Sequence, residues 1–168
     1  SDKVKYFAGF GYVKQDALYG DTRTNKSTSG FNRYNARVNI DANIVDKYLN
    51  LSADMAYRQE DRNSIAGSTS DVFNNMHRNP QTDPGRFPDG NLGKVSLGVN
   101  PIGLATEGGW VKDRKSVLNT RFMLDFNVPG LEGLNLKGIF SYDKIFNSIK
   151  RWTTPVDFYV RNKITGEY

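Results

Sequence analysis

A strict alternation of apolar and polar residues over 33–58 is the feature that most constrains the fold of this chain. Within 33–44 every even-numbered residue is apolar and every odd-numbered residue is polar, and the alternation resumes over 49–58. A period of two over this length predicts β-strands with one face in an apolar medium and the other in water. The link between the two runs is short, so we expect a hairpin with a tight turn around Asp46 and Lys47.

Three further segments alternate in the same way, at 4–15, 116–128 and 134–144. The hairpin strands have about ten or more residues each, whereas strands of soluble proteins usually have about five or six and about nine to eleven tilted residues cross a bilayer. The assigned apolar stripes, such as the even-numbered residues of 4–12 and of 134–142, carry no charged residue. A lipid face requires such an absence of charge, although the core of a soluble sandwich excludes charge as well.

The lengths of the connections separate these two possibilities. They run long, short, very long, short and long, at 15–30, 45–48, 59–115, 129–133 and 147–168. Outer-membrane barrels combine short periplasmic turns with long extracellular loops in this way. We therefore predict an all-β fold, an antiparallel up-and-down transmembrane β-barrel segment of about five strands. Aromatic residues belong at the two interfaces, so we expect Tyr34 and Tyr57 near the outer one and Tyr48 near the inner one.

The longest loop, 59–115, is expected to lie outside the membrane and to carry one short helix. Ser70 or Asp71 can cap this helix, and it should end before the first of three prolines that are spaced four residues apart over 80–88. Each proline fixes its own φ and biases the preceding residue towards extended geometry, so this segment is predicted to be a stiff, irregular arm.

Composition excludes several classes of protein. The net charge of +5 comes from scattered Lys and Arg rather than from a basic run, so no nucleic-acid partner is expected. No stretch approaches the about 20 apolar residues of a membrane helix. Because the chain starts without Met or a leader, and Lys3 already belongs to a predicted strand, we expect residues 1–168 to be part of one barrel domain, without its plug or signal peptide.

Four segments, in this order, resemble those of the SusC-like TonB-dependent transporters. YFAGFGYVKQDA at 6–17 resembles the family strand YF-x-S-G-G-Y-x-N-Q-x-G, and RYNARVNIDANIVDKYLNLSADM at 33–55 resembles the two strands that follow it. RNPQTDPGRFPDGN at 78–91 is similar to the proline-spaced loop of the family, and VPGLEGLNLKGIFSYD at 128–143 to its later Gly-Leu turn. The four segments are spread over most of the chain, from 6 to 143.

The sequence departs from the family pattern at Phe10, Lys14 and Ala17, where the family usually has Gly, Asn and Gly. These departures affect the fine geometry of the first loop rather than the fold.

The resemblance implies a 22-stranded plugged barrel in the outer membrane of a Gram-negative cell. Such transporters import glycan oligosaccharides or peptides, are driven by the TonB complex and are capped by a SusD-like surface lipoprotein. Five strands cannot close a barrel, and an open edge in lipid leaves backbone groups unpaired. We therefore expect the remainder of the same barrel and the outer-membrane lipid to be partners of this segment, while the parts that contact TonB lie elsewhere.

No catalytic residue, metal site or cofactor is expected, and the chain is predicted not to be an enzyme. His77 is the only histidine, and no His, Asp and Glu spacing typical of zinc occurs. Polar residues on the stripes that face away from lipid are predicted to line the lumen and to pair across strands: Arg33, Arg37, Asp41, Asp54, Arg58, Arg121 and Asp125. Residues expected in loops could contact substrate or a partner, the aromatic ones by stacking on sugar rings: Phe87, Trp110, Trp152, Arg86 and Asp89, with Tyr19 as a further loop aromatic.

Two other functions remain open from the residues alone. A soluble all-β carbohydrate-binding or adhesive module would use the same apolar stripes as its core. A segment of a passive porin would share the barrel but not the motifs of the transporter family. The number of alternating strands in the parent protein, and an upstream plug, would distinguish the importer from both.

Overall fold

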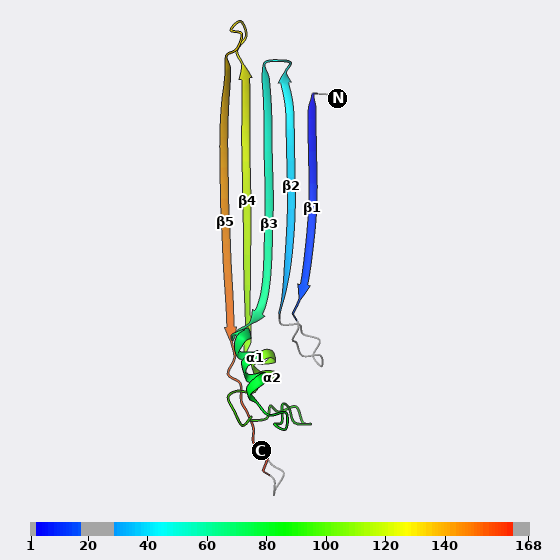
Figure 1. Ribbon diagram of the computed structural model, residues 1–168, viewed down its shortest axis with the longest axis vertical. Coiled ribbons are helices and arrows are strands. Elements are labelled where there is room, and N and C mark those ends of the chain that lie inside the picture. The colour runs from blue at the N-terminus through cyan, green and yellow to red at the C-terminus, as the bar shows by residue number, and fades with distance from the viewer. Residues whose placement is uncertain (1–2, 18–28, 163–168) are drawn as a thin grey trace. The chain divides into compact units, whose positions relative to one another are not determined.

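The structure is a computed structural model that describes residues 3–17 and 29–162. Five antiparallel strands lie side by side in chain order in one up-and-down sheet (Figure 1). They are β1 (Val4–Asp16), β2 (Gly30–Val45), β3 (Leu49–Ile65), β4 (Gly109–Asn127) and β5 (Asn135–Thr153). The prediction of an all-β, antiparallel, up-and-down arrangement of five strands is confirmed.

Three strands extend well beyond the alternating segments. β3 continues to Ile65, β4 begins at Gly109 and β5 continues to Thr153, so the insert between β3 and β4 shortens to 66–108. The residues in these extensions are polar or mixed on both faces, and only the backbone ladder marks them as strand. The amide of Ala66 still donates to the Gly109 carbonyl at 3.2 Å.

Each pair of neighbouring strands keeps one register from end to end. On β4 and β5, the Val128 amide donates to the Leu134 carbonyl at one end and the Thr154 amide donates to the Gly108 carbonyl at the other. The same number of residues separates these two bonds on each strand, so the register does not change between them. Backbone bonds at both ends agree in the same way for β1–β2 and for β3–β4, so no net bulge lies between those ends. On β2–β3 the contact between Arg33 and Glu60 matches the register that the turn sets. Because side chains alternate strictly along a strand, odd and even residues stay on opposite faces throughout.

Both predicted tight turns are present. In the β2–β3 turn, Lys47 adopts a φ of 70° and the amide of Tyr48 donates to the Val45 carbonyl at 2.9 Å. In the β4–β5 turn, Gly130 and Gly133 have φ values of 83° and 88°, which glycine adopts without steric cost.

Two helices, rather than the predicted one, lie in the insert: α1 (Thr69–Arg78) and α2 (Pro101–Thr106). The cap of α1 is Ser68, so the prediction of Ser70 or Asp71 is wrong. The helix starts earlier because the Ser68 carbonyl already accepts from the Asp71 and Val72 amides, at 3.1 and 3.4 Å. α1 ends before Pro80, as predicted.

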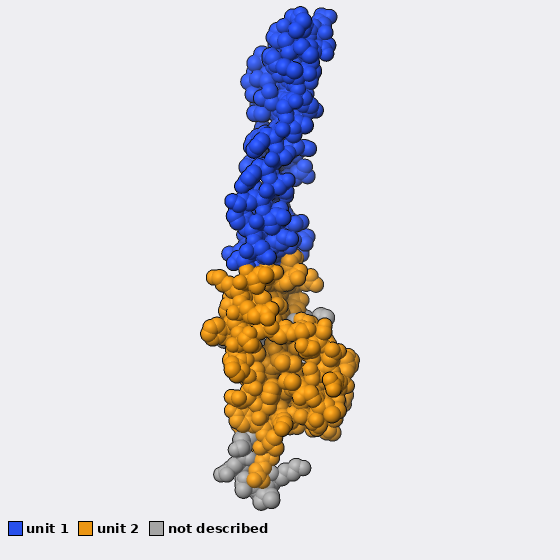
Figure 2. All heavy atoms as spheres, turned by 90° about the vertical axis from the view of Figure 1, so that its left-hand side faces the viewer, with its two compact units in different colours: residues 1–14, 32–61, 114–148 blue, residues 15–31, 62–113, 149–168 orange. Residues whose placement is uncertain are grey.

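Figure 2 colours two compact units of the chain separately. Unit 1 comprises 1–14, 32–61 and 114–148, and unit 2 comprises 15–31, 62–113 and 149–168. Among the described residues, Val117 is the one buried hydrophobic residue of unit 1, and the others belong to unit 2: Ile65, Val72, Leu92, Val95 and Ala105. Unit 2 therefore contains a small hydrophobic core, whereas unit 1 is a single-layered sheet.

Candidate functional site

One face of the unit 1 sheet is apolar and uncovered by any other described part of unit 1. We call it the apolar face. It consists of the even residues of β1, β2, β4 and β5 and the odd residues of β3. Large side chains on it are strongly exposed, with Tyr6 at 82% and Phe10 at 75%. Phe122 and Phe140 stack across β4 and β5 with their ring centroids 6.5 Å apart.

On four of the five strands a tyrosine is the last residue of the uninterrupted apolar stripe, and a polar residue takes the next place on the same face. On β5 the exposed Phe146 follows that polar residue. The four residues are Tyr12, Tyr34, Tyr57 and Tyr142. The polar residues that follow are Lys14, Asn32, Gln59 and Lys144. Tyr12, Tyr34 and Tyr57 lie towards the end of unit 1 remote from the Asp46 turn, whereas Tyr142 lies midway along the part of β5 in unit 1. The rings of Tyr12 and Tyr34 are 5.1 Å apart. The uninterrupted apolar stripes of these four strands therefore end at a row of tyrosines.

This row runs obliquely across the strands. The residue that faces Tyr34 on β3 is Gln59, so Tyr57 lies two residues nearer the Asp46 turn. Leu118 on β4 faces Tyr57, and Lys144 on β5 faces Leu118. Tyr142 therefore lies a further two residues nearer the Asp46 turn. Between β1 and β5 the row shifts by four residues along the strands, which is about 13 Å, and crosses four interstrand distances, which is about 19 Å. The strands therefore tilt by about 35° from the perpendicular to the row.

The opposite face of unit 1, which we call the polar face, is connected by hydrogen bonds across the central strands. Asp54 on β3 accepts from Arg121 on β4 at 2.6 and 3.1 Å and from Asn39 on β2 at 2.6 Å. Asn39 in turn accepts from Arg37 at 2.9 Å. Arg37, expected to pair with an acid, is thus linked to Asp54 through an amide.

The remaining predicted lumen residues also lie on the polar face. Glu60 contacts Arg33 at 3.1 Å and Arg58 at 3.5 Å, and Asp125 accepts a hydrogen bond from Asn135. Asp41 lines an open pocket of about 320 Å³ with other polar-face and neighbouring residues: Lys3, Lys5, Ala42, Asn43, Asn50, Leu51 and Ser52. The structure therefore places all seven predicted residues on one face.

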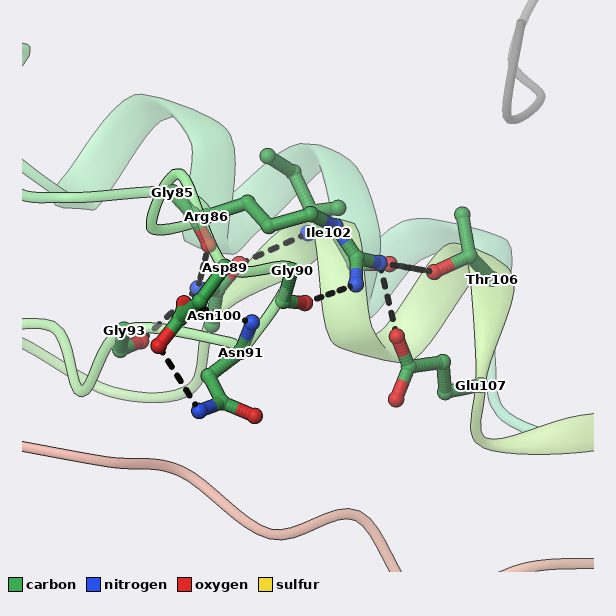
Figure 3. A network of polar contacts seen from close by, with 10 residues as sticks. All are labelled: Gly85, Arg86, Asp89, Gly90, Asn91, Gly93, Asn100, Ile102, Thr106 and Glu107. Carbon is green, nitrogen blue, oxygen red and sulfur yellow. Dashed lines mark hydrogen bonds and ion pairs between the residues drawn. The ribbon is translucent and has the colours of Figure 1, made fainter. Parts of the chain in front are cut away.

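Within unit 2, residues 66–108 form a folded lobe around the side chain of Asn100, which is 1% exposed. Its amide donates to the carbonyls of Gly85 at 2.6 Å and Gly93 at 2.8 Å, and its oxygen accepts from the Ile102 amide at 2.9 Å (Figure 3). The last contact caps α2, and Pro101 occupies the first position of that helix, where no amide is needed. One buried amide thus joins the proline-spaced segment to α2.

Arg86, expected to contact substrate or a partner, is engaged inside the lobe. Its guanidinium group bonds to the Gly90 carbonyl at 2.5 Å and to Glu107 at 2.7 Å (Figure 3). Asp89 accepts from the amide and side chain of Asn91, both at 3.1 Å, and so shapes a turn. The Phe87 amide donates to the Asn91 carbonyl at 2.8 Å. These contacts confirm an irregular segment and give Arg86 a structural role.

The two tryptophans lie in strands rather than in loops, so that part of the prediction is wrong. Trp110 is the second residue of β4 and Trp152 the last but one of β5, because the backbone ladder extends both strands past the alternating pattern. The structure groups Arg86, Phe87 and Asp89 in one turn and pairs Trp110 with Trp152. His77 lies in the last turn of α1, and Tyr19 lies outside the described residues.

A set of exposed apolar residues lies on the lobe and was not predicted from the sequence. α1 presents Phe73 and Met76, and the segment after the proline-spaced arm presents Leu97 and Val99, with exposures of 38–56%. We call these four residues the lobe patch. The signal for α1 was present in the helical spacing of its apolar residues, whereas nothing in the sequence marks 97–99 as its neighbour.

No protein-family model and no curated protein matches the chain. None of the described helices is both long and apolar enough to span a membrane. Within 3–17 and 29–162, no group of three or more His, Asp or Glu side chains is arranged to hold a metal ion.

Proposed function

We propose that the chain forms part of the β-barrel of an outer-membrane, TonB-dependent transporter of the SusC-like type. In this proposal the apolar face contacts lipid, the polar face lines the lumen, and further strands of the same barrel pair with β1 and β5. The transporter imports glycan oligosaccharides or peptides into a Gram-negative cell. A SusD-like lipoprotein binds on the outer side, and the TonB complex acts through other parts of the protein.

The oblique row of tyrosines is the observation that carries this proposal. Strands of outer-membrane barrels tilt by about 35–45° and carry aromatic girdles at both interfaces. The tilt of about 35° obtained from the row lies at the edge of this range. The apolar stripe of β2 from Tyr34 to Ile44 is about 33 Å long, and at such tilts it spans about 25 Å, the height of the apolar band of these barrels.

The bare apolar face argues against a soluble module. Soluble monomers rarely expose contiguous apolar patches larger than a few hundred Å², and larger ones mark membrane or protein contacts. The five strands of unit 1 present such a patch without a second layer among the residues that the structure describes. A sandwich would require an opposing sheet of similar length.

The polar face supports a water-filled lumen. Asp54, Glu60 and their arginine partners keep side chains that are 21–58% exposed. Charges with this exposure remain solvated, and such pairs typically contribute about 0–1 kcal/mol each. They suit a wet wall better than the dry interior of a sandwich.

The substrate class and the lipoprotein partner rest on the motif resemblance, and the lobe adds support to the partner. The lobe patch presents Met76 at 56% and Leu97 at 51% exposure. Exposed apolar side chains on a folded lobe suit a protein partner better than a sugar, which requires convergent polar groups.

The test is depth-resolved quenching of an introduced indole. Val38→Trp is made in the complete protein, with Trp110, Trp152 and any other tryptophan changed to Phe, and compared with Arg37→Trp in the same background. Bromine on the lipid acyl chains should quench the indole introduced at position 38 and leave the indole introduced at position 37 largely unquenched, because neighbouring residues face opposite sides. Equal quenching, or none at either position, would reject the lipid-facing assignment.

A further inference from the structure

The open pocket on the polar face of unit 1 lies at the end nearest the Asp46 turn. The Asn43 amide donates to the Lys3 carbonyl at 2.7 Å, which sets the register of β1 and β2, and the turn sets that of β2 and β3. In these registers the polar residues around the pocket form two rows of directly opposed residues: Lys3–Asn43–Asn50 and Lys5–Asp41–Ser52. Opposed residues project from the same face, so all six surround one space of about 320 Å³.

The two charged side chains in the middle of this pocket are not paired with each other. In the part of the chain that the structure describes, the side chains of Lys5 and Asp41 form no ion pair or hydrogen bond, although they face each other. On the same face, Asp54 and Glu60 are bonded to arginines. A ligand that enters the pocket therefore meets an ammonium group and a carboxylate that have no other partner in unit 1.

The charges around the pocket balance. Lys3 pairs with Asp46 at 3.3 Å, and Lys5 is opposed by Asp41. A cluster without net charge selects neither an anion nor a cation, but it offers donors and acceptors on all sides, since amide and hydroxyl groups provide both. The hydroxyl groups around a neutral sugar ring match this arrangement, whereas a peptide presents its polar backbone groups along a line.

An aromatic residue that departs from the pattern of the sheet lies next to the pocket. Phe7 is on the polar face, two residues from Lys5 along β1, and its side chain is 59% exposed. Every other aromatic residue in the strands of unit 1 is on the apolar face. A Cβ built on Gly9 would lie 3.3 Å from two atoms of the Phe7 ring, so the ring lies beside the backbone of Gly9, which leaves room for it.

A flat exposed ring beside convergent polar groups suits a carbohydrate. The face of an aromatic ring carries partial negative charge, and it attracts the C–H groups on the apolar side of a sugar ring. Ligand pockets combine such apolar surface with a few placed polar groups, and about 320 Å³ is at the lower end of their volumes. The two residues from Lys5 to Phe7 span about 7 Å of strand, which favours an oligosaccharide over a single ring.

We propose that the pocket and Phe7 form a binding site for a neutral oligosaccharide on the lumen wall. This inference rests on the proposed function, because it takes the polar face as the wall of the lumen. It selects sugars over peptides and adds a site at the end of the lumen that faces the periplasm, where an imported chain leaves the barrel. Lys5 and Asp41 bond to the hydroxyl groups of one ring, and Phe7 stacks on a neighbouring ring.

The experiment uses the complete protein in a detergent without sugar groups and counts bound ligands by native mass spectrometry. The probes, measured one at a time, are linear hexasaccharides of glucose, mannose, galactose and xylose, together with hexagalacturonate and hexaalanine. At least one neutral hexasaccharide should bind. D41A should weaken one bound molecule of it about tenfold, as expected for lost hydrogen bonds to a charged group. Because Asp41 is exposed and has no side-chain partner among the described residues, D41A should leave the barrel folded.

Variants at Phe7 separate stacking from simple packing. F7L keeps an apolar side chain but removes the flat ring, and it should weaken binding about fivefold. F7W keeps a flat ring and should bind as the unaltered protein does. The matched controls on the same face are V13A on β1 and D143A on β5, where Asp143 accepts from Asn119 at 2.7 Å. Both controls should bind all probes unchanged.

Four results would overturn the inference: no binding of any neutral hexasaccharide, equal losses in the site and control variants, full binding by F7L, or tighter binding of hexagalacturonate or hexaalanine. If D41A destabilises the complete barrel and leaves sugar binding unchanged, the pocket holds another part of the protein, and the inference is likewise wrong.

Failure of this site is distinct from failure of the proposed function. Quenching of the indole at position 38 by brominated lipid, without sugar binding, rejects only the site. Sugar binding that depends on Asp41 and Phe7, without quenching at position 38, rejects the proposed function and with it the place of this site in a lumen.

Discussion

Asn100 shows how one side chain can organise a loop that has little hydrophobic core. Its amide donates to one carbonyl of the proline-spaced segment, at Gly85, and to one just after that segment, at Gly93, and its oxygen caps α2. Gly93 makes this arrangement possible, because a Cβ there would lie 2.2 Å from the Pro84 carbonyl oxygen. The geometry therefore depends on an amide at 100 and on the absence of a side chain at 93.

Asn100→Asp should unfold the lobe while leaving the strands intact. The change removes both donors and places a carboxylate against two carbonyls, and a buried group left without its partner costs about 1–3 kcal/mol. We expect the lobe to lose at least about 2 kcal/mol. Hydrogen exchange of the Ile102 amide should accelerate, while that of the Asn127 amide in β4 stays slow. The exposed control Asn74→Asp should change neither rate, and equal acceleration in both variants would contradict this role of Asn100.

The two faces can be separated with adjacent residues of similar hydropathy. Leu124 lies on the apolar face and Met123 on the polar face of β4. If the apolar face contacts lipid, Leu124→Lys should cost about 2–4 kcal/mol and Met123→Lys at most about 1 kcal/mol. Chemical unfolding of the complete barrel from phosphatidylcholine vesicles measures both values. Similar costs at the two positions would contradict the assignment of faces.

At the scale of elements, amide side chains join α1 to the segment that follows the proline-spaced arm. Asn75 accepts from the Val99 amide at 2.9 Å, and Asn79 accepts from the Leu97 amide at 3.2 Å. These bonds replace the backbone ladder that the irregular segment lacks. Deleting 79–91 would remove Asn79 together with Gly85, and such a deletion would report on folding of the lobe rather than on contacts with a partner.

Substitutions on the lobe patch test partner contact without removing the hydrogen bonds of Asn75 and Asn79. Met76→Asp with Leu97→Asp places two charges on exposed positions and should weaken binding of the cap lipoprotein by at least about tenfold, since loss of one buried anchor costs about 2 kcal/mol or more. Co-purification and uptake assays should both fall while the amount of assembled barrel is unchanged. Asn74→Asp on the same helix is the control, and undiminished binding by the double variant would remove the lobe patch from the interface.

For the whole molecule, the up-and-down order of the strands assigns the connections to two sides. The turn at Asp46 and the turn over 130–133 join strands at one end of the sheet, and 66–108 follows the other end of β3. Under the proposed function the first end faces the periplasm and the second faces the outside, because the long connections of these barrels are extracellular.

Cysteine labelling of intact cells tests this topology. An impermeant maleimide should modify Asn74→Cys, on the exposed side of α1, and should reach Asp46→Cys only after the outer membrane is permeabilised. The chain has no cysteine of its own, so each variant carries one site in this segment. Equal labelling of both variants in intact cells would contradict the assigned orientation.

The sequence by itself determined the strands where one face is apolar, because a period of two has only one regular interpretation over ten or more residues. It also determined which residues share a face and where the two tight turns lie. The polar residues from Arg33 to Asp125 could therefore be assigned to one face before their partners were known. The resemblance that suggests a transporter rests on these segments and on the proline-spaced loop at 78–91.

Only the tertiary structure decided the features that depend on partners distant in sequence. Trp110 and Trp152 belong to strands because backbone groups pair across β4 and β5, and such pairing leaves no side-chain pattern. Arg86 is structural because Gly90 and Glu107 surround it, although its sequence context resembles a contact loop. The tyrosine row depends on registers between strands, and a register is a property of two strands at once, so no single segment of sequence specifies it.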